Sequence, residues 1–419
     1  MNITRKEIGK GVFFSHIKTD KYKTGRISVN FVLPLDEKTA TENTLVFAYL
    51  RMNCKRFESF SDLNRTLSDL YGAALYDDTA KMGDMQVLTV AASFLSGNVA
   101  PVGESISLDI SKLLSDIIFC PKTENGEFLK EETDIQKENL REEILSELND
   151  KRRYALRKAI GELFKGKPFA VSSAGSLEGI NAATTETLIK RYEEILKTAS
   201  VEIIYDGPDS TEKIEKIFSE RFSNVNERTP VDRVNSAFSA GEIIRINEEM
   251  KVSQAKEVLV FTLPEENRAV LKVLCAVFGA TPFSMLFKTV REKMSLCYYC
   301  SASFVRSKNI MIVESGVDNS KVKDAEKAIC AELKKLCSGE FSDELLSDTK
   351  RYLCSLLKAV EDAPNAYSDK YLTSVVLSEG LNENEKAEIE AVSREDLMRA
   401  AEKTRLCEVY VLAGGKNDK

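Results

Sequence analysis

Histidine is almost absent from this sequence: 419 residues contain one, His16. Zinc peptidase sites of the H-x-x-E-H type need two histidines one helical turn apart. A single histidine therefore excludes H-x-x-E-H, H-x-x-E-E-H and every other two-histidine ligand set. His16 itself lies in a strand-like run, Val12–Ile17, far in sequence from any cysteine or acidic cluster. We interpret it as a surface or strand residue and not as a ligand.

A basic excess and a long apolar run are also missing. The 59 lysines and arginines face 66 aspartates and glutamates, a net charge of -7, and a nucleic-acid-binding surface needs the opposite balance. No apolar run approaches the ~20 residues that span a bilayer. The first residues have no apolar segment behind their charges, so we do not expect a secretory signal. These absences predict a cytoplasmic protein that binds neither nucleic acid nor membrane.

The nine cysteines are odd in number and scattered, which is a poor disulfide framework and fits a reduced cytosol. Cys297 and Cys300 have C-x-x-C spacing, but they lie in a β-like stretch, Leu296–Phe304. Residues three apart on a regular strand point to opposite faces. We therefore predict that these two thiols form neither a shared metal site nor a redox pair.

The sequence repeats itself weakly, in four pairs of segments that occur in the same order. A strand-like run followed by a helix-like segment appears twice. Two later segments each resemble another segment about 200 residues further along the chain. Thr184 and Ser393, in the last pair, are typical helix N-caps. The pairs are Arg26–Pro34 with Lys256–Pro264, Glu42–Arg51 with Asn267–Phe278, Asp150–Tyr154 with Asp348–Tyr352, and Ile180–Leu188 with Ile389–Leu397.

Each half reads strand, helix, strands, helices, strand, and the last strands are Val201–Gly207 and Val409–Gly414. This order predicts an α+β protein with two homologous sandwich domains, each a largely antiparallel sheet with helices packed on it. Polar and helix-breaking residues favour a linker between the halves. We place the N-terminal domain at 1–225, the linker at 226–239 and the C-terminal domain at 240–419.

Several segments resemble one peptidase family. The most specific is Ser284-Met-Leu-Phe287-Lys-Thr-Val-Arg291-Glu-Lys-Met-Ser-Leu-Cys-Tyr298, and 23–31 and 69–76 add weaker likeness. They are similar to the insulinase and pitrilysin type of zinc metallopeptidase, in particular to bacterial members related to mitochondrial processing peptidase. The resemblance covers nearly the whole chain, and it implies the two-domain fold expected above.

The chain departs from that family at the metal motif. Active relatives carry H-x-x-E-H on the helix after the first hairpin, and the matching positions here are Thr44, Phe47 and Ala48. None of these side chains can bind zinc or deprotonate a water molecule. The family's third ligand is a glutamate on a later acidic helix, which resembles Lys137–Asp150. Its candidates are Glu142, Glu143 and Glu147, which we interpret as solvated or capping carboxylates in the absence of the histidines.

Arg291 and Tyr298 are the functional residues that the resemblance implies. In paired members of the family, an arginine and a tyrosine at this spacing help to bind the substrate, and they lie on the subunit that lacks zinc. A guanidinium can grip a carboxylate or a carbonyl, and a phenol can hydrogen-bond the scissile carbonyl. The alternative is that Arg291 forms a surface ion pair and Tyr298 packs in a core.

The resemblance therefore implies a non-catalytic, substrate-binding subunit of a heterodimeric zinc metallopeptidase that acts on small or unfolded peptides. We expect no cofactor in this chain, zinc in a homologous catalytic partner, and no activity of the chain alone. A homodimer of the isolated chain is plausible. The alternative is a catalytically dead scaffold or binding protein with the same fold, in which Arg291 and Tyr298 would be relics.

Overall fold

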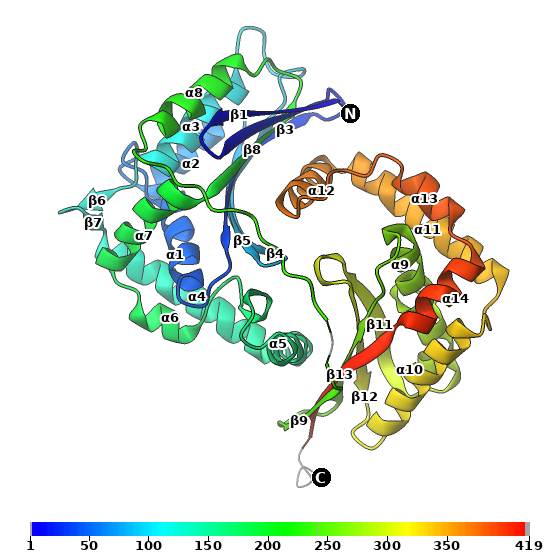
Figure 1. Cartoon of the computed structure of the whole chain (residues 1–419). Coiled ribbons are helices and arrows are strands. Elements are labelled where there is room, and N and C mark those ends of the chain that lie inside the picture. The colour runs from blue at the N-terminus through cyan, green and yellow to red at the C-terminus, as the bar shows by residue number, and fades with distance from the viewer. Residues whose placement is uncertain (1, 240, 415–419) are drawn as a thin grey trace. The chain divides into compact units, whose positions relative to one another are not determined.

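The computed structural model describes residues 2–239 and 241–414, and they form two compact units, each with its own sheet (Figure 1). Unit 1 contains residues 2–145, 171–235 and 361–381. Unit 2 contains the described residues of 146–170, 236–360 and 382–414. No helix in the described part of the chain is long and apolar enough to cross a membrane.

The sheet of unit 1 has the strand order β1-β2-β8-β3-β5-β4. The neighbours β2 and β8 run parallel, and the other neighbouring strands run antiparallel. The central strand β3 is nearly fully buried on both faces, and its apolar residues alternate with the buried polar residues Arg26, Ser28 and Asn30. The strands are β1 (Asn2–Gly9), β2 (Val12–Lys18), β3 (Thr24–Pro34), β4 (Ala74–Met82), β5 (Met85–Leu95) and β8 (Ser200–Gly207), with a small separate hairpin β6–β7 (Thr123–Glu124 and Glu127–Phe128).

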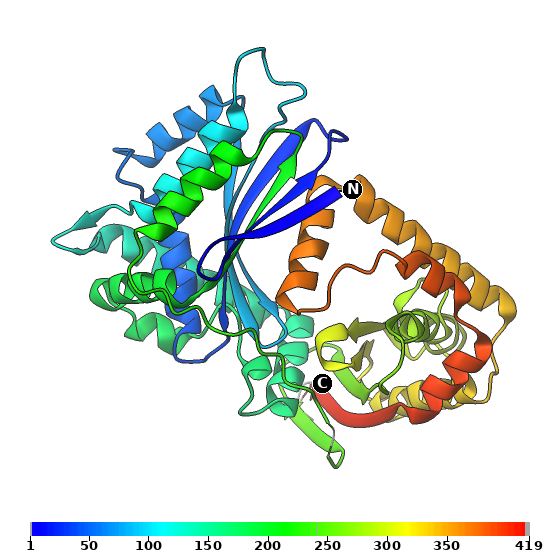
Figure 2. The same cartoon turned by 45° about the horizontal axis from the view of Figure 1, so that its top comes forward.

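Helices cover one face of this sheet, and their apolar sides form the main core of unit 1 with large buried side chains such as Phe31, Phe47 and Phe218. The helices are α1 (Ala40–Met52), α2 (Phe60–Asp69), α3 (Ile106–Phe119), α4 (Lys130–Asn149), α6 (Leu177–Ala182), α7 (Thr185–Thr198) and α8 (Glu212–Ser223). The opposite face is covered by α12 (Pro364–Val376), drawn in orange in Figure 2. Its Tyr371, Leu372 and Val376 pack on residues of β2, β3 and β5.

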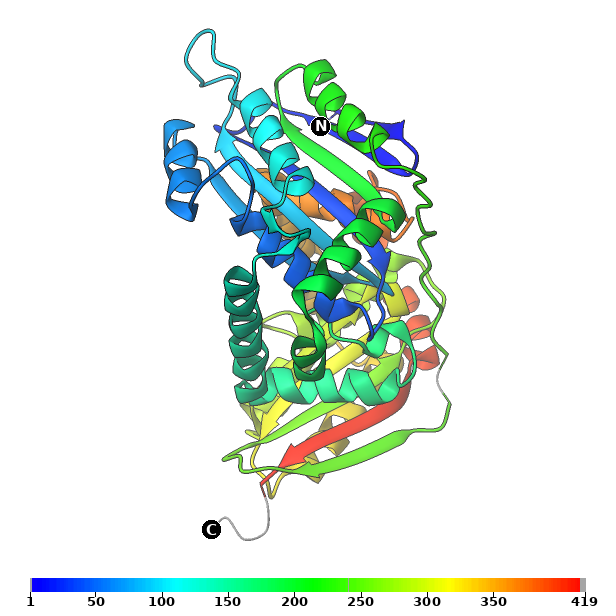
Figure 3. The ribbon, with the colours of Figure 1, turned by 90° about the vertical axis from the view of Figure 1, so that its left-hand side faces the viewer.

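The sheet of unit 2 has the order β11-β12-β10-β13-β9. Only β13 and β9 among these neighbours run parallel, and Figure 3 shows them side by side in red and green. The strands are β9 (Ile244–Glu249), β10 (Ala255–Thr262), β11 (Cys297–Val305), β12 (Ile310–Val317) and β13 (Arg405–Ala413).

One face of the unit 2 sheet carries helices from the C-terminal half, and the other carries α5 (Lys151–Leu163), whose Tyr154, Ala159 and Ile160 are buried against it. The helices are α9 (Arg268–Cys275), α10 (Val322–Cys337), α11 (Asp343–Asp362), α13 (Glu385–Ala391) and α14 (Arg394–Lys403), the π-helices η2 (Ala276–Ala280) and η3 (Phe287–Lys293), and the short 3-10 turns η1 (Pro168–Ala170) and η4 (Arg306–Lys308).

The strand orders of the two units match, which agrees with the internal repeat seen in the sequence. In the order β2-β8-β3-β5-β4 of unit 1, each strand corresponds to one in the order β9-β13-β10-β12-β11 of unit 2, and the single parallel pair lies at the same end. Thr184 and Ser393 both close capping boxes, at the start of α7 and α14. The predicted α+β fold with largely antiparallel sheets is confirmed.

One of the four matched pairs is wrong. Asp150 caps α5, where its side chain accepts hydrogen bonds from the amides of Arg152 and Arg153. Asp348 instead lies inside α11 and has no capping role. The two segments therefore occupy different places in their units, one at the start of a helix and the other inside one.

Each unit includes a segment from the other half of the chain, because 146–170 clusters with unit 2 and 361–381 with unit 1. The domain boundaries drawn from the sequence stay a prediction. The predicted linker contains no helix or strand among its described residues, and its first part is hydrogen-bonded to unit 1. The guanidinium of Arg228 is buried and donates to the carbonyls of Lys10, Leu196 and Ala199, and burial lowers its pKa to about 10.

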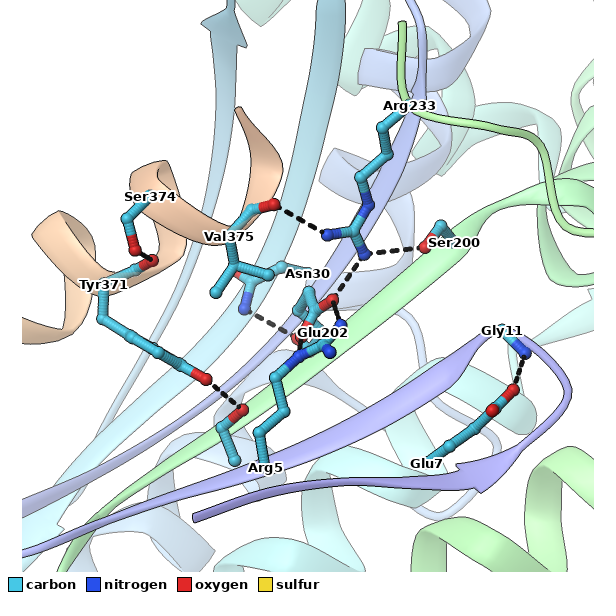
Figure 4. Close-up of polar contacts among 11 residues, drawn as sticks. Arg5, Glu7, Gly11, Asn30, Ser200, Glu202, Arg233, Tyr371, Ser374 and Val375 are labelled. Atoms are coloured by element: carbon cyan, nitrogen blue, oxygen red, sulfur yellow. Dashed lines mark hydrogen bonds and ion pairs between the residues drawn. The ribbon is translucent and has the colours of Figure 1, made fainter. Parts of the chain in front are cut away.

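Glu202 on β8 is fully buried and binds two arginines (Figure 4). Arg5 on β1 donates through Nε and Nη2, at 3.2 and 2.7 Å. Arg233 donates to the same carboxylate, to the Ser200 hydroxyl and to the carbonyl of Val375 on α12. One carboxylate therefore ties the first strand, the linker and α12 to the sheet of unit 1.

We expect Glu202→Gln to destabilise the protein by about 3–5 kcal/mol, because it leaves two arginines without their buried counter-charge. The free energy of unfolding in urea measures this. As a control, Glu186→Gln removes the partner of Lys190 in an exposed pair on α7 and should leave the unfolding midpoint unchanged. Equal midpoints for both variants would contradict the role given to Glu202.

Unit 2 buries a carboxylate without such partners. Glu408 on β13 is fully buried, and neither carboxylate oxygen has a hydrogen-bond partner among the described residues. Burial raises the pKa of Glu408 to about 8, and the charge of Glu162 on α5 adds to the effect. The folded protein therefore keeps a proton that the unfolded chain, with an ordinary glutamate pKa of 4.5, has lost.

Because the folded state binds the extra proton, this group makes stability fall as the pH rises from about 4.5 to about 8, and adds no slope above that range. We expect Glu408→Leu to remove this slope and to be more stable than the wild type at pH 9, by on the order of 3 kcal/mol. Urea unfolding at pH 5, 7 and 9 tests this. Glu249→Leu, at an exposed position of β9, is the control and should keep the wild-type slope. An unchanged slope in the Glu408 variant would refute the account.

Candidate functional site

The three degenerate metal positions lie on α1 and are occupied by other contacts. The Thr44 hydroxyl lies within hydrogen-bond distance of the carbonyls of Ala40 and Ser173, at 3.0 and 3.1 Å. Phe47 is buried in the core, where its ring meets that of Phe31 edge-on with 5.2 Å between centroids. Ala48 is half-buried.

A network of amide side chains surrounds these positions. Gln86 on β5 donates to the carbonyls of Ala40 and Ser173, and it accepts a hydrogen bond from Asn43 at 2.7 Å. Arg191 on α7 donates to Asn43 in turn. A hydroxyl, an aromatic ring and a methyl group do not fit zinc, and their polar neighbours already bond to each other.

The candidate third ligands do not converge on a site. Glu142 and Glu143 are exposed on α4, and Glu147 forms an ion pair with Arg157 at 3.6 Å. Within residues 2–239 and 241–414, no three histidine, cysteine, aspartate or glutamate side chains are placed to hold a metal ion. His16 hydrogen-bonds the carbonyl of Gly207 at 2.9 Å and stacks on the ring of Tyr205. The interpretation of these residues as carboxylates and a histidine without a metal stays a prediction.

Arg291 lies in the π-helix η3, whose wider turn is shown by the hydrogen bond from the amide of Met294 to the carbonyl of Thr289, five residues earlier. Its side chain is exposed, and the guanidinium carbon lies 4.6 Å from the centre of the Phe287 ring. It forms no ion pair and no hydrogen bond with any other residue that the structure describes. The surface ion pair considered as the alternative is therefore not formed.

Tyr298 lies at a break in the regular pairing of edge strand β11. Cys297 pairs with Val317 and Tyr299 with Gly316, so Tyr298 is the extra residue of a β-bulge. Its side chain is 63% exposed, which contradicts the alternative of a core position. Ser295, just before the strand, has φ +49°, in the left-handed region. Bulges redirect side chains, and both bulges and π-helices occur often at functional sites.

The prediction that Cys297 and Cys300 point to opposite faces is wrong, and the bulge is the reason. The extra residue shifts the alternation of side chains along β11. Both thiols are therefore buried on the same face of the sheet, the face on which α9, η2 and η3 pack. A hydrogen bond between the thiols lowers the pKa of Cys297, helped by Arg291 and opposed by burial, and it raises the pKa of Cys300 together with burial. Both cysteines are free thiols.

Unit 2 thus brings Arg291 and Tyr298 onto consecutive elements, η3 and β11, while Thr44, Phe47 and Ala48 belong to unit 1. Sequence reasoning missed Phe287 as a contact of Arg291. Its signal was present, because residues four apart on a helix lie on the same side.

Comparison with known proteins gives a consistent picture. Residues 182–353 match the family model described as the peptidase M16 inactive domain. The chain is 24% identical over 403 residues, 95% of each chain, to the probable inactive metalloprotease YmfF of Bacillus subtilis (strain 168). Its fold is similar to that of a conserved protein from Enterococcus faecalis V583, with TM-score 0.91, 24% identity and full coverage of both chains. It is also similar to a peptidase M16 inactive domain from Pseudomonas fluorescens, with TM-score 0.79, 15% identity and full coverage of both chains.

The family model and the curated relative are both described as inactive, which agrees with the side chains found at Thr44, Phe47 and Ala48. The resemblance to insulinase- and pitrilysin-type peptidases is confirmed. Residues 182–353 are therefore similar to the inactive domain of M16 peptidases, and over 95% of its length the chain is similar to a relative described as a probable inactive metalloprotease.

Proposed function

We propose that this protein is the non-catalytic, substrate-binding subunit of a heterodimeric zinc metallopeptidase that acts on small or unfolded peptides in the cytoplasm. A homologous catalytic subunit would supply the zinc and the H-x-x-E-H motif. This chain would supply Arg291 and Tyr298 for binding the peptide.

The observation that carries the proposal is that both side chains are exposed on irregular backbone and that no described residue hydrogen-bonds or pairs with either of them. Arg291 has no counter-ion among the described residues, and Tyr298 points outward from a bulge. A planar guanidinium can bind a carboxylate or two peptide carbonyls, and a phenol can donate to the carbonyl under attack. These are the roles of a substrate-binding pair, and neither requires a metal in this chain.

Helix α1 is well packed without a metal, as expected for a subunit that does not carry out the chemical step. The positions of the ligands and of the general base are filled by Thr44, Phe47 and Ala48, with a buried ring contact and hydrogen bonds to backbone carbonyls. Unit 1 therefore keeps a stable fold without the site, and the chemical step falls to the partner.

Mixing the chain with a co-encoded zinc-bearing homologue should give a stable complex and peptide hydrolysis that neither chain shows alone. We expect Arg291→Ala to lower kcat/KM about tenfold to a hundredfold, because one charge-assisted contact to the peptide is lost. Tyr298→Phe, which removes only the hydroxyl, should lower it by a similar factor. Hydrolysis of a quenched fluorescent peptide measures both.

Lys327→Ala is the control, because it removes an exposed positive charge from α10 of the same unit, outside η3 and β11. It should retain wild-type turnover. Failure to form a complex, or no gain in activity on mixing, would rule out the proposed function. Full turnover by both the Arg291 and Tyr298 variants would instead favour the scaffold alternative.

A further inference from the structure

We infer that Phe287 is a positioning residue that holds Arg291 ready to bind a carboxylate of the peptide. This inference rests on the proposed function, because it concerns the same binding residues. It adds a third residue to them and narrows the substrate to peptides that present an acidic side chain or a free carboxyl end.

The evidence is a contrast among arginines that lie over aromatic rings. In six other such contacts the guanidinium also donates to a carboxylate or a carbonyl, and only in Arg291 among these seven does the ring stand alone. The other six are Arg5 with Glu202, Arg26 with Asp369, Arg56 with Asp116, Arg152 with Glu314, Arg228 with three carbonyls, and Arg394 with Asp343.

An aromatic ring can order the side chain of Arg291 and leave its charge available, which an ion pair could not. The face of Phe287 restricts the guanidinium by a cation–π contact, but it neither cancels the charge nor occupies the N–H donors in the plane. A carboxylate partner would do both. The fork of donors on Arg291 therefore remains open for a planar anion, and part of the cost of ordering it is already met.

The surroundings of Arg291 favour an anion with an apolar neighbour. The helix η3 carries Lys288, Arg291 and Lys293 against Glu292, so positive charges exceed negative ones by two. Met294 and Tyr298 follow, and both side chains are about half exposed or more. The field of Arg291 also reaches Cys297, the residue before Tyr298. We therefore expect a carboxylate flanked by a large apolar side chain to bind best.

Two rhodamine-labelled peptide amides serve as probes, Gly-Ser-Gly-Leu-Glu-Leu-Gly-Ser-Gly and its twin with Gln in place of Glu. Fluorescence polarisation with the full chain at low salt gives the two Kd values. We expect about a tenfold preference for the Glu peptide, lost in Arg291→Ala. Phe287→Leu should reduce that preference about two- to fivefold with little effect on the Gln peptide, and Phe287→Tyr should retain it.

Phe341→Leu is the control, because Phe341 stacks on Arg394 in the same way but that arginine is paired with Asp343. It should leave both Kd values unchanged. Weaker binding in Arg291→Ala together with a wild-type preference in Phe287→Leu would overturn the role of Phe287 alone. Equal affinity of the wild type for the two peptides would overturn the carboxylate selection. Binding to Arg291→Ala as strong as to the wild type, or no binding to the wild type, would overturn the proposed function as well.

Discussion

The fold of unit 1 depends on one buried carboxylate. Glu202 lies in the middle of the sheet, and its two arginine partners come from the first strand and from the linker. Arg5 precedes Glu202 by 197 residues in the sequence. Arg233 continues the connection to α12 through the carbonyl of Val375. Burying a charge is costly unless it is fully paired, so these distant segments must all be in place before Glu202 is stable. The contact therefore makes the assembly of unit 1 cooperative.

The second face of each sheet is covered by a helix from the other half of the chain, α12 in unit 1 and α5 in unit 2. The acidic side chains near these helices have different surroundings. Under α12, Asp206 accepts a hydrogen bond from Ser368 at 2.7 Å. Under α5, Glu248 accepts hydrogen bonds from the hydroxyls of Tyr154 and Tyr410. Glu408 has no hydrogen-bond partner within residues 2–239 and 241–414, and burial raises its pKa to about 8. Acidic side chains thus accompany the apolar contacts of the helices that cover these faces.

The sequence predicted the regular parts of this architecture well, because alternation, helix periodicity and capping residues report directly on burial. The fold class, the repeat of the two halves and the caps Thr184 and Ser393 are of this kind. What it could not predict were departures from the period. The bulge at Tyr298 reverses the facing of Cys297, and the π-helix at Arg291 widens a turn without any change in residue type. The side chains of the candidate site lie at these departures. The residue pattern alone could therefore not identify Arg291 and Tyr298, and only the resemblance to relatives named them.

These departures also bear on whether Arg291 and Tyr298 are relics. A left-handed serine, a bulge and a π-helix lie within twelve residues of each other. The left-handed conformation of Ser295 costs on the order of 1–3 kcal/mol. The metal positions on α1 show the opposite state, since there the side chains are packed or hydrogen-bonded within a regular helix. A chain that had lost peptide binding together with catalysis would gain stability by relaxing η3 and β11 in the same way. The contrast between the regular backbone at the metal positions and the irregular backbone at Arg291 and Tyr298 is the physical reason for the proposal that these two residues still bind a substrate.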